Sequence, residues 1–223
     1  MKTLRFNVFN QIHKALRLFM FDTVTLMQQT DMTDAEASLP VIEQANALLD
    51  VFDSHAYYED TYILACAQQH DEALIASFEN EHHIDLELTE NLRAGIALYN
   101  LAKSPAERFE AGNKLYYALN EFVAFNLSHM NKEELQLNEL LWSKFTDEEI
   151  MGMEHNITQN IPMEKMGLYS KWMIKGINNI ELSNWLSAVK AGAPDFVYNG
   201  LIEECRNYLP AERFEMIGQL QAV

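Results

Sequence analysis

Four long runs of helical periodicity dominate the first part of the chain. Apolar residues recur every three or four positions through residues 5–29, 38–69, 71–103 and 105–142, without the alternation that marks a strand. The connections between the runs are short. Because long helices with short connections pack as antiparallel neighbours, the pattern predicts an all-α fold with an up-down-up-down four-helix bundle.

Residues typical of helix starts mark the borders of these runs. Ser104, Pro105 and Glu107 match a cap, a first-turn proline and a first-turn acid. Ser38, with Pro40 following in the first turn, is a second candidate cap.

The chain changes character past Trp142. Shorter helices are expected there, over residues 146–162, 164–176, 180–191, 195–208 and 211–220. We therefore predict a four-helix bundle over residues 1–142. A helical C-terminal extension over residues 143–223 would pack on or beside that bundle.

Two of the long runs carry the same pair of metal-binding residue types. Glu59 follows His55 by four positions, and Glu133 follows His129 by four positions. Residues four apart share one helix face, with Cβ atoms about 5–6 Å apart, so each pair can reach one ion or two bridged ions. Imidazole and carboxylate ligands together favour iron, manganese or zinc.

These polar pairs interrupt helix faces that are otherwise apolar. The stripe of the second run is Leu48, Phe52, His55, Glu59, Tyr62 and Cys66, and that of the fourth run is Phe122, Phe125, His129, Glu133, Leu137 and Leu140. Cys66 is therefore expected in the core. Buried glutamates are costly unless they are paired or bound to metal, so the pattern predicts a metal pair inside the bundle.

Histidines on the other two long runs complete the candidate ligand set. His13 interrupts the apolar face of the first run, and His82 lies nearer than His83 to the apolar direction of the third run. His83 and Glu87 form a third pair with the same spacing, expected at the surface. His155, beyond the bundle, is expected to have an ordinary surface or packing role; an extra ligand from His83 or His155 is the alternative.

Composition excludes several classes of partner. The formal net charge of −17 leaves no basic surface for nucleic acid, and it disfavours anionic membranes. The sequence shows no signal peptide and no apolar stretch long enough to span a membrane. Two cysteines make no disulfide framework, and reduced cysteines fit a cytoplasmic protein.

Taken in this order, the residues resemble the hemerythrin family in its broad cation-binding form, over roughly residues 5–142. The resemblance implies a four-helix bundle around two non-haem iron ions, with manganese or zinc as alternatives. The terminal ligands would be His13, His55, His82 and His129. Glu59 and Glu133 would bridge the two ions.

One departure from the oxygen-carrying members bears on function. Those proteins have a second histidine one turn after the third-helix histidine, and here that position is Leu86. Fewer ligands leave open coordination positions, which suits reactivity more than reversible oxygen storage. The arrangement is closer to the family branch associated with nitrosative stress and the repair of iron centres.

Three functions remain open at this point. The first is a di-iron protein that reacts with or senses dioxygen, peroxide or nitric oxide. The second is iron storage and donation to damaged iron centres. The third is an interaction module with a structural metal, in which residues 143–223 do the work. No nucleophile, phosphate loop or nucleotide motif is visible, so enzyme chemistry other than redox has no support.

Overall fold

The computed structural model describes residues 5–221, and this part of the chain is all-α, with helices joined by short connections and no strand. The outermost residues of both predicted domains, 1–4 and 222–223, lie outside the described residues. No helix among the described residues has the length and apolar character needed to cross a membrane.

The chain forms two compact units. Of the described residues, the first contains 5–8 together with Met20–Gln159, and the second contains Phe9–Phe19 together with 160–221. The border between them therefore falls inside the first helix. Compact units are defined by contacts and not by independent folding, so the division into domains 1–142 and 143–223 stays a prediction.

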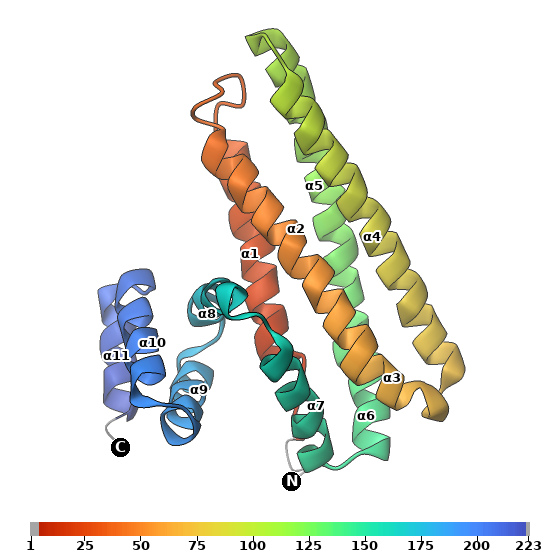
Figure 1. Ribbon diagram of the computed structural model, residues 1–223, viewed down its shortest axis with the longest axis vertical. Coiled ribbons are helices and arrows are strands. Elements are labelled where there is room, and N and C mark those ends of the chain that lie inside the picture. Colours follow the sequence, from red (N-terminus) through yellow and green to blue (C-terminus); the bar gives the residue numbers. More distant parts are fainter. Residues whose placement is uncertain (1–4, 222–223) are drawn as a thin grey trace. The chain divides into compact units, whose positions relative to one another are not determined.

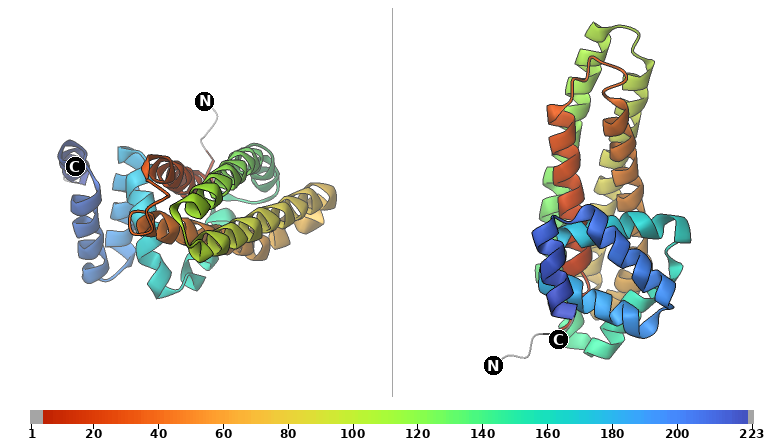
Figure 2. Two further views of the ribbon diagram at one scale, coloured as in Figure 1. Left: turned by 90° about the horizontal axis from the view of Figure 1, so that it is seen from above. Right: turned by 90° about the vertical axis from the view of Figure 1, so that its left-hand side faces the viewer.

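The long helices are α1 (Asn10–Gln29), α2 (Leu39–Glu59), α4 (Glu72–Leu101) and α5 (Pro105–Lys132). In the first unit, α4 and α5 lie side by side in every view (Figure 1, Figure 2). Gln44 of α2 donates hydrogen bonds to Asp22 and Thr23 of α1, and Tyr116 of α5 donates one to Gln28. These polar contacts join the second half of α1 to α2 and α5.

Helix α1 begins later than predicted, at Asn10 instead of residue 5. The guanidinium of Arg5 donates to the carbonyl oxygens of Trp142 and Phe145, at 2.8 and 2.7 Å. The indole of Trp142 donates to the carbonyl of Phe6 at 2.7 Å. The backbone carbonyl of Phe6 thus bonds to the end of helix α6 (Asn138–Lys144), not within a helix of its own.

Two helices change to π-helical geometry at a predicted ligand pair, one directly after Glu59 and the other starting at Glu133. The segment η1 (Asp60–Leu64) continues α2 into α3 (Ala65–Ala67) and the 3₁₀ turn η2 (Gln68–His70). The segment η3 (Glu133–Leu137) continues α5 into α6. A π turn holds an extra residue, so the side chains beyond it change face.

That change of face corrects part of the predicted apolar stripe. After Glu59, the buried side chains are Ile63, Leu64 and Ala67, whereas Cys66 is exposed. The prediction that Cys66 lies in the core is wrong, because straight α-helical spacing does not continue through η1.

The predicted helix starts differ in outcome. Ser104 forms a full capping box with Glu107 at the start of α5, as predicted. Ser38 precedes α2, but its side chain makes no cap; its hydroxyl donates instead to the carbonyl of Ala35 at 3.0 Å. Asp71, a residue not predicted as a cap, caps α4 by accepting from the backbone of Leu74.

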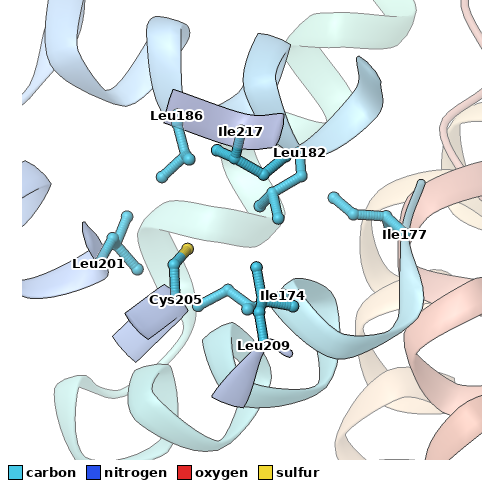
Figure 3. Packing of buried hydrophobic residues seen from close by; sticks show 8 residues of the cluster. All are labelled: Ile174, Ile177, Leu182, Leu186, Leu201, Cys205, Leu209 and Ile217. Atoms are coloured by element: carbon cyan, nitrogen blue, oxygen red, sulfur yellow. The ribbon is translucent and has the colours of Figure 1, made fainter. Parts of the chain in front are cut away.

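After α7 (Asp147–Asn160), the second unit contains α8 (Met163–Gly176), α9 (Asn179–Gly192), α10 (Asp195–Tyr208) and α11 (Ala211–Gln221). These four helices share an apolar core, shown in Figure 3, which consists of Ile174, Ile177, Leu182, Leu186, Leu201, Cys205, Leu209 and Ile217.

The first half of α1 packs against this C-terminal core. The ring of Phe19 stacks on Trp172 with centroids 4.1 Å apart, and Lys14 forms an ion pair with Glu181. At Gly176, an added Cβ would lie 2.9 Å from the backbone oxygen of Lys14, so only glycine permits this approach.

Candidate metal centre

Four buried side chains converge in the interior of the first unit. Glu59 ends α2, His82 lies on α4, His129 lies on α5, and Glu133 begins η3. One potential ligand atom of each lies within 4.8 Å of those of the other three. The Glu59 side chain is 2% exposed and that of Glu133 is 0% exposed, so these carboxylates lie where water cannot solvate them.

The imidazole Nε2 atoms of the group face the carboxylate oxygens. His129 Nε2 lies 3.2 Å from Glu133 Oε1. His82 Nε2 lies 3.6 Å from Glu59 Oε2 and 3.8 Å from Glu133 Oε1, which is longer than a hydrogen bond. The two rings meet edge to face, with centroids 4.9 Å apart.

His55 approaches the same carboxylates from α2. Its Nε2 lies 3.3 Å from Glu59 Oε1, and one ligand atom each of His55, Glu59 and Glu133 lie within 4.8 Å of one another. Thus both glutamates belong to two overlapping groups of potential ligands. Such sharing is what bridging carboxylates require.

His13 belongs to the second compact unit, on the first half of α1. It is fully buried, and its ring stacks on Phe9 with centroids 5.2 Å apart. Its burial agrees with an inward-facing position, and its assignment as a ligand stays a prediction.

Two further carboxylates hold the outer nitrogens of the histidine rings. Nδ1 of His82 donates to Asp60 Oδ1 at 2.7 Å, and Nδ1 of His129 donates to Glu81 Oε2 at 2.8 Å. Lys132 forms an ion pair with the other oxygen of Glu81. Metal-binding histidines almost always donate their second ring nitrogen in this way, which leaves Nε2 for the metal.

The electrostatics of the group favour a positive charge between its carboxylates. Burial opposes the charged form of His82, but the hydrogen bond to Asp60 and the nearby carboxylates of Glu133 and Glu59 outweigh it and raise the pKa of His82 to about 12. Burial also opposes the charged form of His129, whereas Glu133 and Glu81 together raise its pKa. The raised pKa values mean that protonated His82 and His129 balance the negative charge of the carboxylates, a role that a bound cation could also fill.

Aromatic side chains enclose the histidines. Phe125 stacks on His129 and Phe78 meets its ring at an angle, each with centroids 6.0 Å apart. Phe52 lies against His55 and packs on Phe122 with centroids 5.0 Å apart. The walls are therefore apolar, and polar atoms concentrate at the ligand positions.

A buried polar pair lies one helical turn from the ligands, and the sequence did not reveal it. Asn126 of α5 donates to Asp85 of α4 at 2.6 Å, and both side chains are buried. Burial raises the pKa of Asp85, although the hydrogen bond from Asn126 opposes that effect. The spacing could have indicated this pair, because Asp85 and Asn126 lie three residues from His82 and His129, on the same helix faces.

The remaining candidates lie away from the centre. His83 and Glu87 are exposed on α4, as predicted, and Leu86 is also exposed. His155 is exposed and its ring contacts Gln159, so it makes no part of the buried groups.

The donor set suits a metal of the predicted kind. Imidazole nitrogens and carboxylate oxygens converge without a thiolate, a combination typical of iron, manganese or zinc. The buried carboxylates need a cation, and the outer carboxylates hold two histidines in metal-binding orientation. The residues present therefore fit such a centre.

Comparison with known proteins agrees with the geometry. Searches of curated proteins and of solved structures returned no significant match. The family model described as the hemerythrin HHE cation binding domain matches residues 5–141, which include all six predicted ligands. The chain belongs to the hemerythrin HHE cation-binding family.

Proposed function

We propose that this chain holds two non-haem iron ions inside a four-helix bundle and uses them to react with or sense a small oxidant. The proposed terminal ligands are His13, His55, His82 and His129, listed here as a set. The proposed bridging ligands are Glu59 and Glu133. The oxidant would be dioxygen, peroxide or nitric oxide.

The observation that carries this proposal is the position of the Glu59 carboxylate between two histidines. Its Oε1 lies 3.3 Å from His55, and its Oε2 lies 3.6 Å from His82. A carboxylate with each oxygen turned to a different imidazole is arranged to join two ions. Glu133 supports the same reading, because it belongs with His55 in one group and with His82 and His129 in the other.

Iron held here would supply electrons and open coordination positions to a small molecule. Four imidazoles and two bridging carboxylates provide fewer donor atoms than two six-coordinate ions accept, so positions remain for an exogenous ligand. The apolar rings of Phe52, Phe78 and Phe122 exclude bulk water. Asp60 and Glu81 hold the Nδ1 protons of His82 and His129, so that Nε2 stays directed at the centre.

The first test is metal content. We expect about two irons per chain in the full-length protein from iron-supplemented cells. The double variant His55→Ala/His129→Ala is expected to retain almost none, whereas His83→Ala, at the exposed neighbour of His82, should match the parent. Metal-free parent protein that remains folded would refute the metal centre.

The second test separates reactivity from iron handling. Reduced, iron-loaded protein is mixed with dioxygen, hydrogen peroxide or a nitric oxide donor, and its optical spectrum is followed. A spectral change that the His55→Ala/His129→Ala variant lacks supports the proposal. No change with any of the three oxidants would refute it, and iron transfer to an apo-acceptor would then support donation instead.

A further inference from the structure

His82 and His129 are each hydrogen-bonded to a carboxylate from the preceding long helical run. Asp60, next to the ligand Glu59, binds His82 on α4. Glu81, next to the ligand His82, binds His129 on α5. A chain of contacts thus passes from α2 to α4 and from α4 to α5, and each contact starts beside a proposed ligand.

The π-helical segment η1 places the first of these carboxylates. Asp60 is its first residue, directly after Glu59. The two consecutive side chains lie at opposite edges of the His82 ring, with Glu59 3.6 Å from Nε2 and Asp60 hydrogen-bonded to Nδ1 at 2.7 Å. The ring is therefore fixed in rotation as well as in position.

The second carboxylate is held differently. Glu81 accepts from His129 with one oxygen and pairs with Lys132 through the other. Lys132 lies three residues after His129 on α5, so the same helix supplies the histidine and the cation that anchors its partner. Hydrogen bonds and charge from Lys132 and His129 lower the pKa of Glu81 despite the opposing effect of its burial.

The two contacts also differ in exposure to water. The Asp60 side chain is 46% exposed, whereas that of Glu81 is 16% exposed. Water can therefore take the place of the Asp60 carboxylate next to His82. It has little access to the place of Glu81, and Lys132 would lose its partner there.

We propose that Asp60 and the Glu81–Lys132 pair are positioning residues that set how tightly His82 and His129 hold metal, with Glu81 the stronger contributor. This inference rests on the proposed metal centre. Asp60, Glu81 and Lys132 touch no metal in this scheme. They act by fixing the tautomer and the rotation of the two imidazoles.

The test uses cobalt(II) as the probe and the full-length chain. Affinity is measured by competition with a chelator, and the visible ligand-field spectrum reports the geometry around the ion. We expect Asp60→Ala to weaken binding about 10-fold and Glu81→Ala to weaken it about 100-fold, the range typical of such outer partners. Lys132→Met should weaken cobalt(II) binding less than Glu81→Ala does, because Glu81 keeps its hydrogen bond to His129.

Matched controls separate positioning from folding. Glu87→Ala removes an exposed carboxylate from the same helix as Glu81 and should leave affinity and spectrum unchanged. Asp60→Glu keeps a carboxylate at this position, so it tests whether that group rescues the affinity that Asp60→Ala loses. Circular dichroism confirms that each variant is folded; a loss of folded protein alone would lower the amount of bound cobalt without altering its spectrum.

The outcomes are distinguishable. Failure of the parent chain to bind cobalt(II) would remove the proposed function and this inference together. Cobalt binding by the parent with unchanged affinity and spectrum in Asp60→Ala and Glu81→Ala would overturn this inference alone. A larger effect for Asp60→Ala than for Glu81→Ala would overturn the assigned order.

Discussion

Asn126 donates a hydrogen bond of 2.6 Å to Asp85 within the buried interior of the first unit. Asn126 also donates to the carbonyl of Phe122, one turn earlier on its own helix. The amide of Asn126 thus provides a hydrogen-bond donor to a carboxyl group that is almost fully shielded from water. Polar groups in such a position stabilise a fold only while they are satisfied.

Asn126→Ala is expected to lower the free energy of unfolding of the metal-free protein by about 1–3 kcal/mol, because Asp85 loses its donor. Burial raises the pKa of Asp85, so the folded state binds its proton more tightly than the unfolded chain does. Stability from this proton is present at low pH and is lost as pH rises through the folded pKa.

Removing the donor raises the pKa of Asp85 further. The loss of unfolding free energy caused by Asn126→Ala should therefore be larger at pH 8 than at pH 5. Urea unfolding at both pH values measures it. Asp85→Leu/Asn126→Leu, which removes both polar partners, is expected to recover much of the loss. A deficit that is the same at both pH values would count against a charged Asp85 as its cause.

The π-helical geometry of η1 predicts which nearby substitutions destabilise the protein. Ile63→Ala should cost about 2–5 kcal/mol, since Ile63 is buried, whereas Cys66→Ala should change stability little. Chemical denaturation of the two variants compares them directly. Straight α-helical geometry through residues 60–64 would bury Cys66 instead, and equal or reversed losses would refute the π turn.

The two cysteines should differ in reactivity. Cys66 is exposed, while Cys205 is buried in the C-terminal core. Burial and the nearby Glu204 raise the pKa of Cys205 to about 11, so its reactive thiolate is scarce near neutral pH. Labelling with a maleimide at pH 7 should modify Cys66 alone in the folded chain and both residues in denaturant. Cys66→Ser, as control, should abolish labelling of the folded protein.

Glycines of helix α8 provide a matched pair of substitutions. Gly176→Ala should destabilise by about 1–3 kcal/mol, because its Cβ would meet the backbone of Lys14 at 2.9 Å. Gly167→Ala, where the new Cβ would meet no atom within 4 Å beyond its chain neighbours and its own helix backbone, should stabilise by about 0.5–1 kcal/mol. Thermal unfolding measures both. A neutral Gly176→Ala would show that α1 and α8 do not pack this closely.

Much of the secondary structure could be predicted from the sequence. Periodicity placed the long helices, and the choice of His82 over His83 agrees with the burial of one and the exposure of the other. These predictions rest on local spacing, which straight helices keep. The all-α class follows from the same pattern, and the match of the family model confirms the resemblance suggested by the histidine and glutamate residues.

The rest depended on features that spacing does not encode. The π turn after Glu59 shifts the buried face, and so the burial of Cys66 was predicted wrongly. Asp60 and Glu81 reach their histidines across different helices, so their roles follow from contacts between helices distant in sequence. The later start of α1 follows from the long-range bonds of Arg5.

The family model stops at residue 141, yet the turns of α1 that carry His13 pack on helices from well beyond that point. Phe19 rests on Trp172, and Lys14 is tied to Glu181. A chain shortened to the family boundary would keep every proposed ligand and lose the support of one of them. In this protein, the C-terminal helices pack against the part of α1 that carries the proposed ligand His13.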